Sequence, residues 1–436
     1  MPLKTALALL LCLALNPFPS PALDWPQWRG RNRDGKSTDS GLLQEWPAGG
    51  PPLLFRASGL GRGFSSVSLA DGILFTMGDF GSEQQVIALR VEDGSLLWTT
   101  RIGPAWTDRS LYPGSRSTPT VDGERVYALG TEGDLACLRA ATGEILWTRS
   151  LPRDFGGAMM IARAGVEWKY AESPLVDGNR VVVTPGGPTA AIVALDKNDG
   201  KEIWRATVPT LGERGNDGAQ YSSIVVSEGA GVRQYVQLIG RGLIGIRAED
   251  GKFLWGYNRV ANDVANIPTP IVSGNHVFGS TGYQTGAALL ELRPTADGVE
   301  AREVYFLPAG TFQNHHGGVI LQDGYLYAGT GPNAGLPIAA RFETGEVAWG
   351  PIRNEGRNSA SIAYADGQLY FRYQDGLVLL VDATPEAYRE CGSFRIPEVE
   401  NPSWPHPVVS GGRLYLREQD RLYAFDVREQ ERGEKR

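Results

Sequence analysis

The chain of 436 residues repeats one short pattern eight times, and this repetition restricts the fold more than any other feature. Each copy starts with small or polar residues, continues through an apolar position and a turn pair ending in Gly, and ends in a β-branched run. The copies span residues 64–75, 117–130, 173–183, 222–236, 269–280, 317–329, 359–371 and 406–416. Self-similarity at a nearly fixed period indicates one supersecondary unit used many times.

A second pattern, eleven residues long, follows most copies of the first and ends in an aromatic residue. Good copies end at Trp98, Trp147, Trp204, Trp255 and Trp349, and weaker ones end near Tyr305 and Phe394. In both patterns, Asp-Gly, Thr-Gly or Ser-Gly joins two alternating apolar runs, and such pairs supply the positive φ of tight antiparallel hairpins. Each unit is therefore four antiparallel strands, which we call A to D in chain order. The alternation excludes helical repeats, and four strands in roughly 43–57 residues make a β-propeller blade.

The predicted fold is therefore all-β: an eight-bladed β-propeller of four-stranded antiparallel blades over residues 51–427. The last unit lacks an outer strand before the chain enters a charged tail at 428–436, which we expect to be disordered. The segment Pro52–Ala57 has the pattern of a D strand with no A, B or C before it. We expect it to complete the eighth blade, because that pairing leaves no open sheet edge at the join.

The N-terminus has the features of an export signal. Lys4 precedes an apolar run from Ala6 to Leu15, which is shorter than the roughly 20 residues needed to span a bilayer. Small residues then lead to a cleavage site after Ala22, so residues 1–22 are predicted to be a signal peptide. An N-terminal leader over residues 23–50 follows.

Charge and targeting features narrow the location and the partners. A formal net charge of −7 gives no general attraction to nucleic acid, so no such partner is expected. Cys12 lies inside the apolar run and follows a Leu, where a lipoprotein signal requires a small residue. Since no lipid anchor and no later membrane-spanning run is indicated, we expect a soluble monomer in the periplasm or secreted from the cell.

The Trp-terminated pattern resembles the tryptophan-docking motif of the quinoprotein alcohol dehydrogenase-like superfamily, whose propellers carry pyrroloquinoline quinone (PQQ)-like repeats. The resemblance covers residues 50–427 and implies that each Trp packs between neighbouring blades. The leader sequence Trp25–Gly30 is similar to one found in exported bacterial propellers of this type. The superfamily contains PQQ dehydrogenases, which hold the quinone and usually Ca²⁺ in the central funnel. It also contains non-enzymatic members, such as the propeller lipoprotein of the outer-membrane β-barrel assembly machinery, and fold alone does not separate the two groups.

Strand direction predicts where a site would lie. The A–B and C–D turns should share one face and be tight, whereas the B–C and D–A connections should share the other face and be long and polar. Long connections are where function usually lies, and every D–A connection ends at an innermost strand. Residues just before those strands should ring the funnel mouth as candidate ligand-binding residues: Arg62, Arg116, Tyr170, Glu172, Gln220, Asn266, His315, His316, Arg357, Asn358 and His406. Such a ring is either a polar pocket or a water-bridged mouth.

His315 and His316 are the sharpest feature of this ring, since His serves in acid–base and ligand roles. Neighbours on a strand point to opposite faces, so at most one of them should face the axis. No third ligand stands at metal-site spacing, and no metal site is predicted. Aromatic residues in the same loops indicate either a surface for a protein, peptide or glycan partner or loops packed against the ring. They are Trp106, Tyr112, Trp168, Tyr170 and Trp404.

This chain lacks several of the residues that the resemblance implies for quinone chemistry. Such enzymes commonly carry adjacent cysteines whose disulfide stacks on the cofactor, but Cys137 and Cys391 fall in the second and seventh blades and should be buried free thiols. The family's Ca²⁺ is held by carboxylate and amide oxygens. Glu172 and Asn266 have suitable oxygens, but the next inner strand begins with two His residues where an Asp would be expected.

These observations favour an exported, non-catalytic binding or scaffolding module that acts through the face bearing the D–A and B–C connections. No catalytic residues and no cofactor are predicted for it. The alternative is a PQQ-dependent dehydrogenase that holds PQQ and Ca²⁺ in the funnel with atypical ligands. A hydrolase or lyase is not supported, because no nucleophile or carboxylate pair is recognisable.

Overall fold

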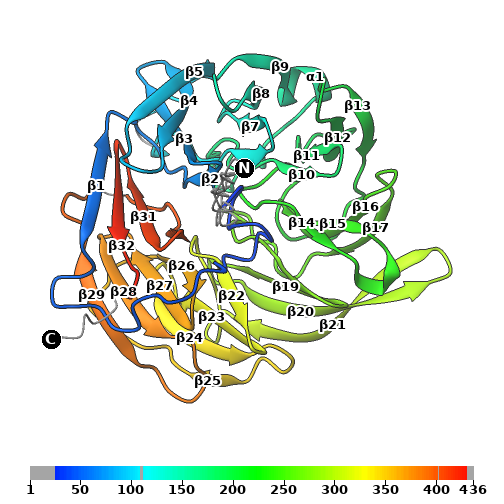
Figure 1. Cartoon of the computed structure of the whole chain (residues 1–436). Coiled ribbons are helices and arrows are strands. Elements are labelled where there is room, and N and C mark those ends of the chain that lie inside the picture. Colours follow the sequence, from blue (N-terminus) through cyan, green and yellow to red (C-terminus); the bar gives the residue numbers. More distant parts are fainter. Residues whose placement is uncertain (1–24, 109–110, 401, 430–436) are drawn as a thin grey trace, which may run out of the picture.

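Eight four-stranded antiparallel sheets stand around a common axis in the computed structural model (Figure 1). The structure describes residues 25–108, 111–400 and 402–429. The expected signal peptide lies outside the described residues, as does most of the charged tail. Arg428, placed in that tail by the sequence, still forms an antiparallel bridge with Leu42. The predicted eight-bladed propeller is confirmed.

The first four blades follow one another in chain order. They consist of β2 (Ser68–Ala70), β3 (Ile73–Phe80), β4 (Glu83–Arg90) and β5 (Leu96–Pro104); β6 (Thr120–Asp122), β7 (Arg125–Leu129), β8 (Asp134–Arg139) and β9 (Ile145–Ser150); β10 (Leu175–Asp177), β11 (Arg180–Val183), β12 (Ile192–Asp196) and β13 (Glu202–Ala206); and β14 (Val225–Ser227), β15 (Gln234–Ile239), β16 (Gly242–Arg247) and β17 (Phe253–Tyr257). A short helix, α1 (Leu151–Phe155), and a 3₁₀ turn, η2 (Gly229–Gly231), lie in connections.

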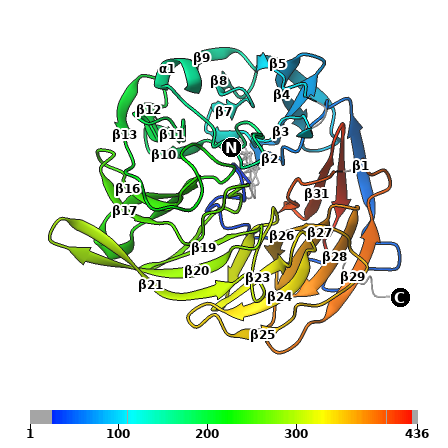
Figure 2. The same cartoon turned by 180° about the vertical axis from the view of Figure 1, so that it is seen from behind.

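The last four blades complete the ring. They consist of β18 (Ile271–Ser273), β19 (His276–Thr281), β20 (Gly286–Thr295) and β21 (Gly298–Pro308); β22 (Val319–Gln322), β23 (Tyr325–Thr330), β24 (Leu336–Arg341) and β25 (Val347–Trp349); β26 (Ala360–Ala365), β27 (Gln368–Tyr373), β28 (Leu377–Asp382) and β29 (Glu390–Arg395); and β30 (Val408–Ser410), β31 (Arg413–Glu418), β32 (Arg421–Asp426) and β1 (Leu53–Ser58). The predicted closure is confirmed, because β1 pairs antiparallel with β32 and places Arg56 opposite Tyr423. In both views β1 lies where the last blade meets the first (Figure 1 and Figure 2).

The hairpin turns have the backbone that the Gly-containing pairs predict. Asp71 and Gly72, for example, join β2 to β3 with φ angles of 49° and 76°, the left-handed pair of a tight primed turn. The expectation of long B–C connections is wrong. Only Gly81 and Ser82 join β3 to β4, and only Gly240 and Arg241 join β15 to β16. The length is therefore concentrated in the D–A connections, because B and C pair as hairpins while D and A belong to different sheets.

Neighbouring blades are joined at the rim by the aromatic residue that ends each second pattern. The Trp98 indole donates a hydrogen bond to the Ala140 carbonyl of the next blade at 3.0 Å. Its ring also lies where a Cβ on Gly143 would approach within 2.5 Å. The indoles of Trp147, Trp204 and Trp349 donate to the next blade in the same way, to the carbonyls of Lys197, Ala248 and Thr384. Tyr305 replaces Trp in the fifth blade and donates to Phe342. Trp255 differs, because its indole bonds Gln234 of its own blade.

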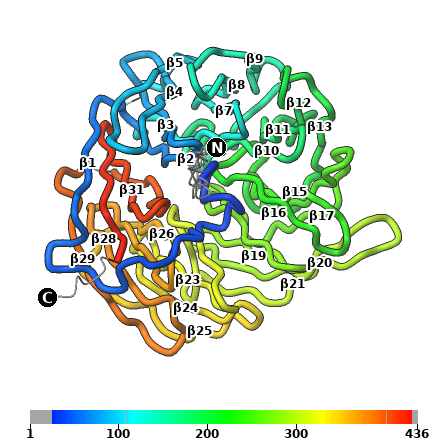
Figure 3. The backbone as a smooth tube through the Cα atoms, viewed as in Figure 1, coloured from blue at the N-terminus to red at the C-terminus, as the bar shows by residue number. Residues whose placement is uncertain are grey.

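The axis of the ring is filled by residues 25–39, which we call the axial segment. Figure 3 traces its path away from the axis toward β1. It forms hydrogen bonds with every one of the eight blades. In blade order, the partners are Leu69, Val121, Ser173, Ile224, Thr269, Val319, Tyr364 and Gly412. The leader therefore connects all blades on their inner side, which supplies the physical role that the sequence pattern leaves open.

The contact between an aromatic ring and a turn glycine predicts a position-specific loss of stability. A Cβ on Gly200 would lie 2.7 Å from the Trp147 ring, whereas a Cβ on Gly178 in the same blade meets no atom within 4 Å. Both glycines have positive φ, at 68° and 62°, so the backbone strain of an Ala is shared. We expect Gly200→Ala to lower the free energy of unfolding by about 1–3 kcal/mol more than Gly178→Ala. Denaturant unfolding of both variants measures this difference, and equal losses would contradict the docking role.

Candidate functional site

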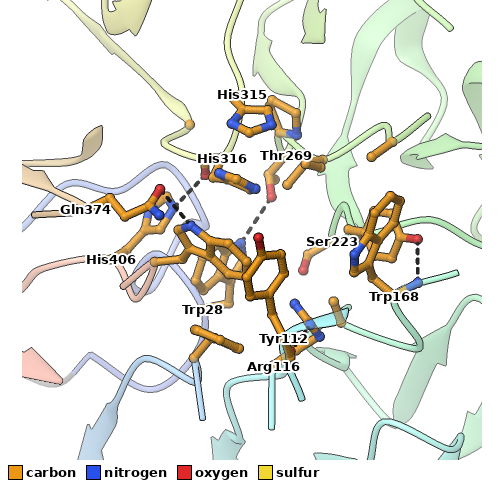
Figure 4. Close-up of a pocket in the computed structure, with 18 of the residues that line it drawn as sticks. Trp28, Tyr112, Arg116, Trp168, Ser223, Thr269, His315, His316, Gln374 and His406 are labelled. Atoms are coloured by element: carbon orange, nitrogen blue, oxygen red, sulfur yellow. Dashed lines mark hydrogen bonds between the residues drawn. The ribbon is translucent and has the colours of Figure 1, made fainter. Parts of the chain in front are cut away.

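A cavity of about 280 Å³ opens around the axis on the face that carries the D–A connections. Side chains from D–A connections, B–C turns and the axial segment line it (Figure 4). Its aromatic residues are Trp28, Phe64, Tyr112, Trp168, Tyr221, Tyr283 and Trp404. Its polar residues are Arg29, Arg116, Ser223, Thr269, His315, His316, Asn333, Gln374 and His406. The cavity is thus an aromatic pocket with basic groups, and no carboxylate is found among its described lining residues.

The axial segment forms the floor of the pocket. The Trp28 indole donates to Thr269 Oγ1 at 3.0 Å, and its ring lies 4.5 Å from the His406 ring. Beside it, Arg29 donates through Nη2 to the Val319 carbonyl at 2.5 Å, while its Nη1 and Nε have no partner in the described structure. Burial lowers the pKa of Arg29 to about 10, so this guanidinium stays charged at neutral pH. The sequence analysis assigned no ligand-binding role to the leader. It therefore did not predict that Trp28 and Arg29 form the floor of the pocket.

A hydrogen-bond network fixes the two adjacent imidazoles. His315 Nδ1 lies 2.9 Å from Asn333 Oδ1, and His315 Nε2 lies 2.8 Å from the Tyr283 hydroxyl. Ser359 donates its hydroxyl proton to Asn333 Oδ1 at 2.5 Å, and its oxygen lies 3.2 Å from His316 Nδ1. The residues sit in a bend before β22, not on the strand. The expectation that only one would face the axis is therefore wrong, and both line the pocket.

These imidazoles are neutral at physiological pH. Burial lowers the pKa of His315 to about 4 and that of His406 to about 3. Burial, followed by the proximity of His315, also holds the pKa of His316 well below its ordinary value. A neutral imidazole has one donor and one acceptor nitrogen. Both nitrogens of His315 are paired, and Nδ1 of His406 is buried, so His316 Nε2 is the ring nitrogen left open to the pocket.

A buried ion pair positions the loop that carries Trp404 and His406. Arg372 on β27 and Glu418 on β31 lie 2.5 Å apart and are almost completely inaccessible. Arg372 also donates to the Pro405 carbonyl at 2.9 Å, and Glu418 accepts from the Glu400 amide at 2.8 Å. The last two blades therefore hold this connection at both ends, which places the indole of Trp404 over the pocket.

Arg116 is the cation at the rim of the pocket. Its guanidinium lies 5.1 Å from the Phe64 ring, 5.4 Å from Trp106 and 5.8 Å from Trp404, distances at which cation–π attraction operates. Nη2 donates to the Tyr112 carbonyl at 2.6 Å, and Nε has no partner in the described structure. Burial lowers the pKa of Arg116 to about 10, so it too is charged at neutral pH.

The structure brings four of the eleven predicted candidates into this pocket: Arg116, His315, His316 and His406. Arg62, Arg357 and Asn358 are exposed and lie outside it. Gln220 and Asn266 are buried behind the wall, where the Gln220 side chain accepts from the Asn266 amide at 2.8 Å. Their side chains bond to neighbouring connections and do not enter the cavity, because the D–A connections turn before they reach the inner strands.

Glu172 and two of the aromatic residues of the D–A connections are also buried. Glu172 Oε2 accepts from the Thr184 amide at 2.9 Å, and Oε1 has no partner in the described structure. Burial raises the pKa of this carboxyl to about 8, although the Thr184 hydrogen bond opposes the shift. Tyr170, another residue of the expected ring, donates to the Pro185 carbonyl, and Trp106 packs under Arg116. Of the two alternatives that the sequence leaves open for the loop aromatics, packing against the ring holds for Tyr170 and Trp106, whereas Tyr112 is exposed.

The donors present do not fit Ca²⁺. This ion takes six to eight oxygen ligands, usually with carboxylates among them, but the described lining residues offer imidazoles, guanidinium groups, hydroxyls and amides. Asn266 Oδ1, the oxygen that could bind the ion, accepts from the Asn262 backbone amide at 3.0 Å. Within the described residues, no group of three or more His, Cys, Asp or Glu side chains could hold a metal ion. The expected free thiols are confirmed, since Cys137 and Cys391 are buried and do not form a disulfide.

Together, the docked blades, the axial segment and the axial pocket define a propeller of the quinoprotein-like class. A family model described as "Outer membrane protein assembly factor BamB" matches residues 82–351. This match covers more than half of the chain, and the chain belongs to this family of propellers with PQQ-like repeats. No helix in the described part of the chain is long and apolar enough to cross a membrane.

Individual relatives come from both functional groups. Polyvinylalcohol dehydrogenase of Sphingopyxis sp. (strain 113P3) is 26% identical over 218 residues, which are 45% of this chain and 29% of that protein. BamB of Escherichia coli (strain K12) is 29% identical over 147 residues, 33% of this chain and 31% of that protein. The alignments span less than a third of either relative. The quinohemoprotein alcohol dehydrogenase ADHIIG from Pseudomonas putida HK5 superposes with a TM-score of 0.63 at 13% identity, over 94% of this chain and 81% of that one. At this identity the likeness shows the fold alone.

The buried Glu172 predicts a pH dependence of stability. Its folded pKa of about 8 lies above its ordinary value of 4.5, so the folded protein binds a proton that the unfolded chain releases between these values. The contribution of the protonated Glu172 to the free energy of unfolding is then fully present below pH 4.5 and is lost as the pH rises toward 8. Glu172→Gln cannot ionise. We expect its free energy of unfolding to rise relative to the parent between pH 5 and pH 8, by at most about 1.4 kcal/mol per pH unit. Urea unfolding at several pH values measures this, and a pH-independent difference would contradict it.

Proposed function

We propose that this protein is an exported, non-catalytic binding module that takes a small ligand, or an exposed segment of a glycan or peptide partner, into the axial pocket. The observation that carries the proposal is the make-up of that pocket: aromatic walls, neutral imidazoles and charged guanidinium groups, with no carboxylate among its described lining residues. Concave sites with apolar walls and a few convergent polar groups are typical of ligand binding. Membership of the assembly-factor family is consistent with a binding role.

The alternative is a PQQ-dependent dehydrogenase. Similarity to polyvinylalcohol dehydrogenase favours it. The donor set weighs against the Ca²⁺ that usually accompanies the quinone, because Glu172 and Asn266 are committed to backbone partners outside the pocket. Ser359 Oγ lies 2.8 Å from His315 Nδ1 and donates to Asn333 Oδ1 at 2.5 Å, an arrangement in which the hydroxyl proton is shared with an amide.

Two binding experiments, a titration and an array measurement, separate these functions. The purified protein is first titrated with PQQ, with and without CaCl₂, and followed by absorbance and thermal shift. It is then applied to glycan and peptide arrays beside Trp404→Ala, which removes a pocket wall, and Ile161→Ala, which truncates a side chain that is 59% exposed outside the pocket. We expect saturable binding to array members that Trp404→Ala weakens by about tenfold or more and that Ile161→Ala leaves unchanged. Saturable Ca²⁺-dependent binding of PQQ with a raised melting temperature would favour the dehydrogenase.

We further propose that the protein acts in the periplasm or outside the cell, with the propeller beginning after a cleaved signal peptide and the 23–50 leader. The expected mature N-terminus is Leu23. Expression of the full chain in a bacterial host, followed by fractionation and N-terminal sequencing, tests this. Recovery of a cytoplasmic protein that begins at Met1 would contradict export.

A further inference from the structure

The side chains of the axial pocket specify a ligand chemistry, and this inference rests on the binding function proposed above. We propose that the pocket binds a hydroxylated organic anion with an apolar ring face, namely a uronic acid, free or as one residue of a glycan. Three independent features carry the inference: two guanidinium groups without a carboxylate partner in the pocket, an imidazole lone pair held open by a hydrogen-bond network, and aromatic walls inclined to one another.

The charge of the pocket selects an anion. Arg116 lines its rim, and Arg29 lies on its floor. Each guanidinium donates through Nη2 to a backbone carbonyl, and Nη1 of Arg116 has no hydrogen-bond partner among the described residues. The unpaired Nε of Arg116 and Nε and Nη1 of Arg29 are buried, so they contribute positive charge and not a direct contact with a ligand. No carboxylate is among the lining residues that the structure describes, so neither charge is neutralised within the cavity. A planar guanidinium matches a carboxylate with two parallel hydrogen bonds.

The imidazole network selects a hydroxyl group on that anion. Ser359 gives its only proton to Asn333 Oδ1, so its oxygen is an acceptor for the two imidazoles near it, His315 Nδ1 at 2.8 Å and His316 Nδ1 at 3.2 Å. His316 Nε2 is therefore a lone pair, and none of the hydrogen bonds of the described residues uses it. His406 adds no second acceptor, because Nε2 donates to the His316 carbonyl at 3.1 Å and the unpaired Nδ1 is buried out of reach, so the acceptor of the pocket is His316 Nε2. A ligand hydroxyl would donate to such an acceptor, whereas a carboxylate alone would leave it unpaired.

The aromatic walls favour a puckered ring over a flat polycycle. Phe64 and Tyr112 meet Trp404 at interplanar angles of 33° and 78°, and Trp28 meets His406 at 58°. These neighbouring rings therefore present single faces at several inclinations and not one continuous flat surface. The C–H faces of a pyranose pack against single indole and phenyl faces at different inclinations. The volume of about 280 Å³ is near the lower limit of small-molecule sites, about 300 Å³, so it suits one or two sugar rings.

Matched pairs of sugars test this assignment on the full-length purified protein. Binding of D-glucuronate, D-galacturonate and D-mannuronate is measured by calorimetry and Trp fluorescence beside D-glucose, D-galactose and D-mannose, which lack the carboxylate. We expect at least one uronate to bind about tenfold more tightly than its neutral partner. In Arg116→Gln this advantage should disappear. In His316→Phe, which keeps a ring on Trp404 but has no acceptor, both members of the pair should bind more weakly.

Two control variants carry the same changes outside the pocket. Arg357→Gln removes an exposed guanidinium, and His276→Phe replaces the imidazole on β19; both should bind as the parent does. Equal affinity within every pair, or a uronate preference that survives Arg116→Gln, would overturn the ligand class. Failure of all six sugars would also overturn it. In these cases the binding function stands if an array ligand still depends on Trp404, and it falls together with the ligand class if none does.

Discussion

A closed ring of eight blades leaves a hole along its axis. The axial segment occupies this hole and forms hydrogen bonds with all eight blades. Arg33 illustrates the physics: its buried guanidinium donates to the carbonyls of Ser173 and Ile224, which precede the inner strands of two adjacent blades. Inner strands that converge on an axis expose carbonyls with no strand partner, and unpaired buried carbonyls are costly. The segment satisfies them. It also closes one end of the hole, so that a channel becomes a pocket with a floor.

The rim is stabilised by a different interaction. In four blades an indole donates to a carbonyl of the next blade, and in the fifth blade Tyr305 does so, which fixes these blades to their neighbours at the outer edge. Pairing of β1 with β32 then joins the two ends of the chain within one sheet. Inner and outer constraints together hold side chains from seven D–A connections around one cavity, which is what a preorganised site requires.

The pocket differs from a quinone–Ca²⁺ site in the chemistry of its donors. Members of one fold bind different ligands because function depends on the side chains placed on the scaffold. Here the connection before β22 supplies two imidazoles where a hard cation would need carboxylates. Low pKa values keep those imidazoles neutral, so they act as hydrogen-bond partners and leave the positive charge of the pocket to Arg29 and Arg116. The result is a site suited to recognising an anion with donors of its own.

The sequence by itself determined the blades, their number, their turns and the closure, because these depend on local patterns: alternation, Gly pairs and a Trp at a fixed place. It also located the face of the site and four of its residues. Tertiary structure decided the rest. Whether Glu172 or His316 enters the pocket depends on how each D–A connection bends, and those bends are fixed by contacts between blades that are distant in sequence, such as the Arg372–Glu418 pair. The same holds for Trp28 and Arg29: nothing local tells a leader to cross the axis, since its hydrogen-bond partners exist only once all eight blades have met around it.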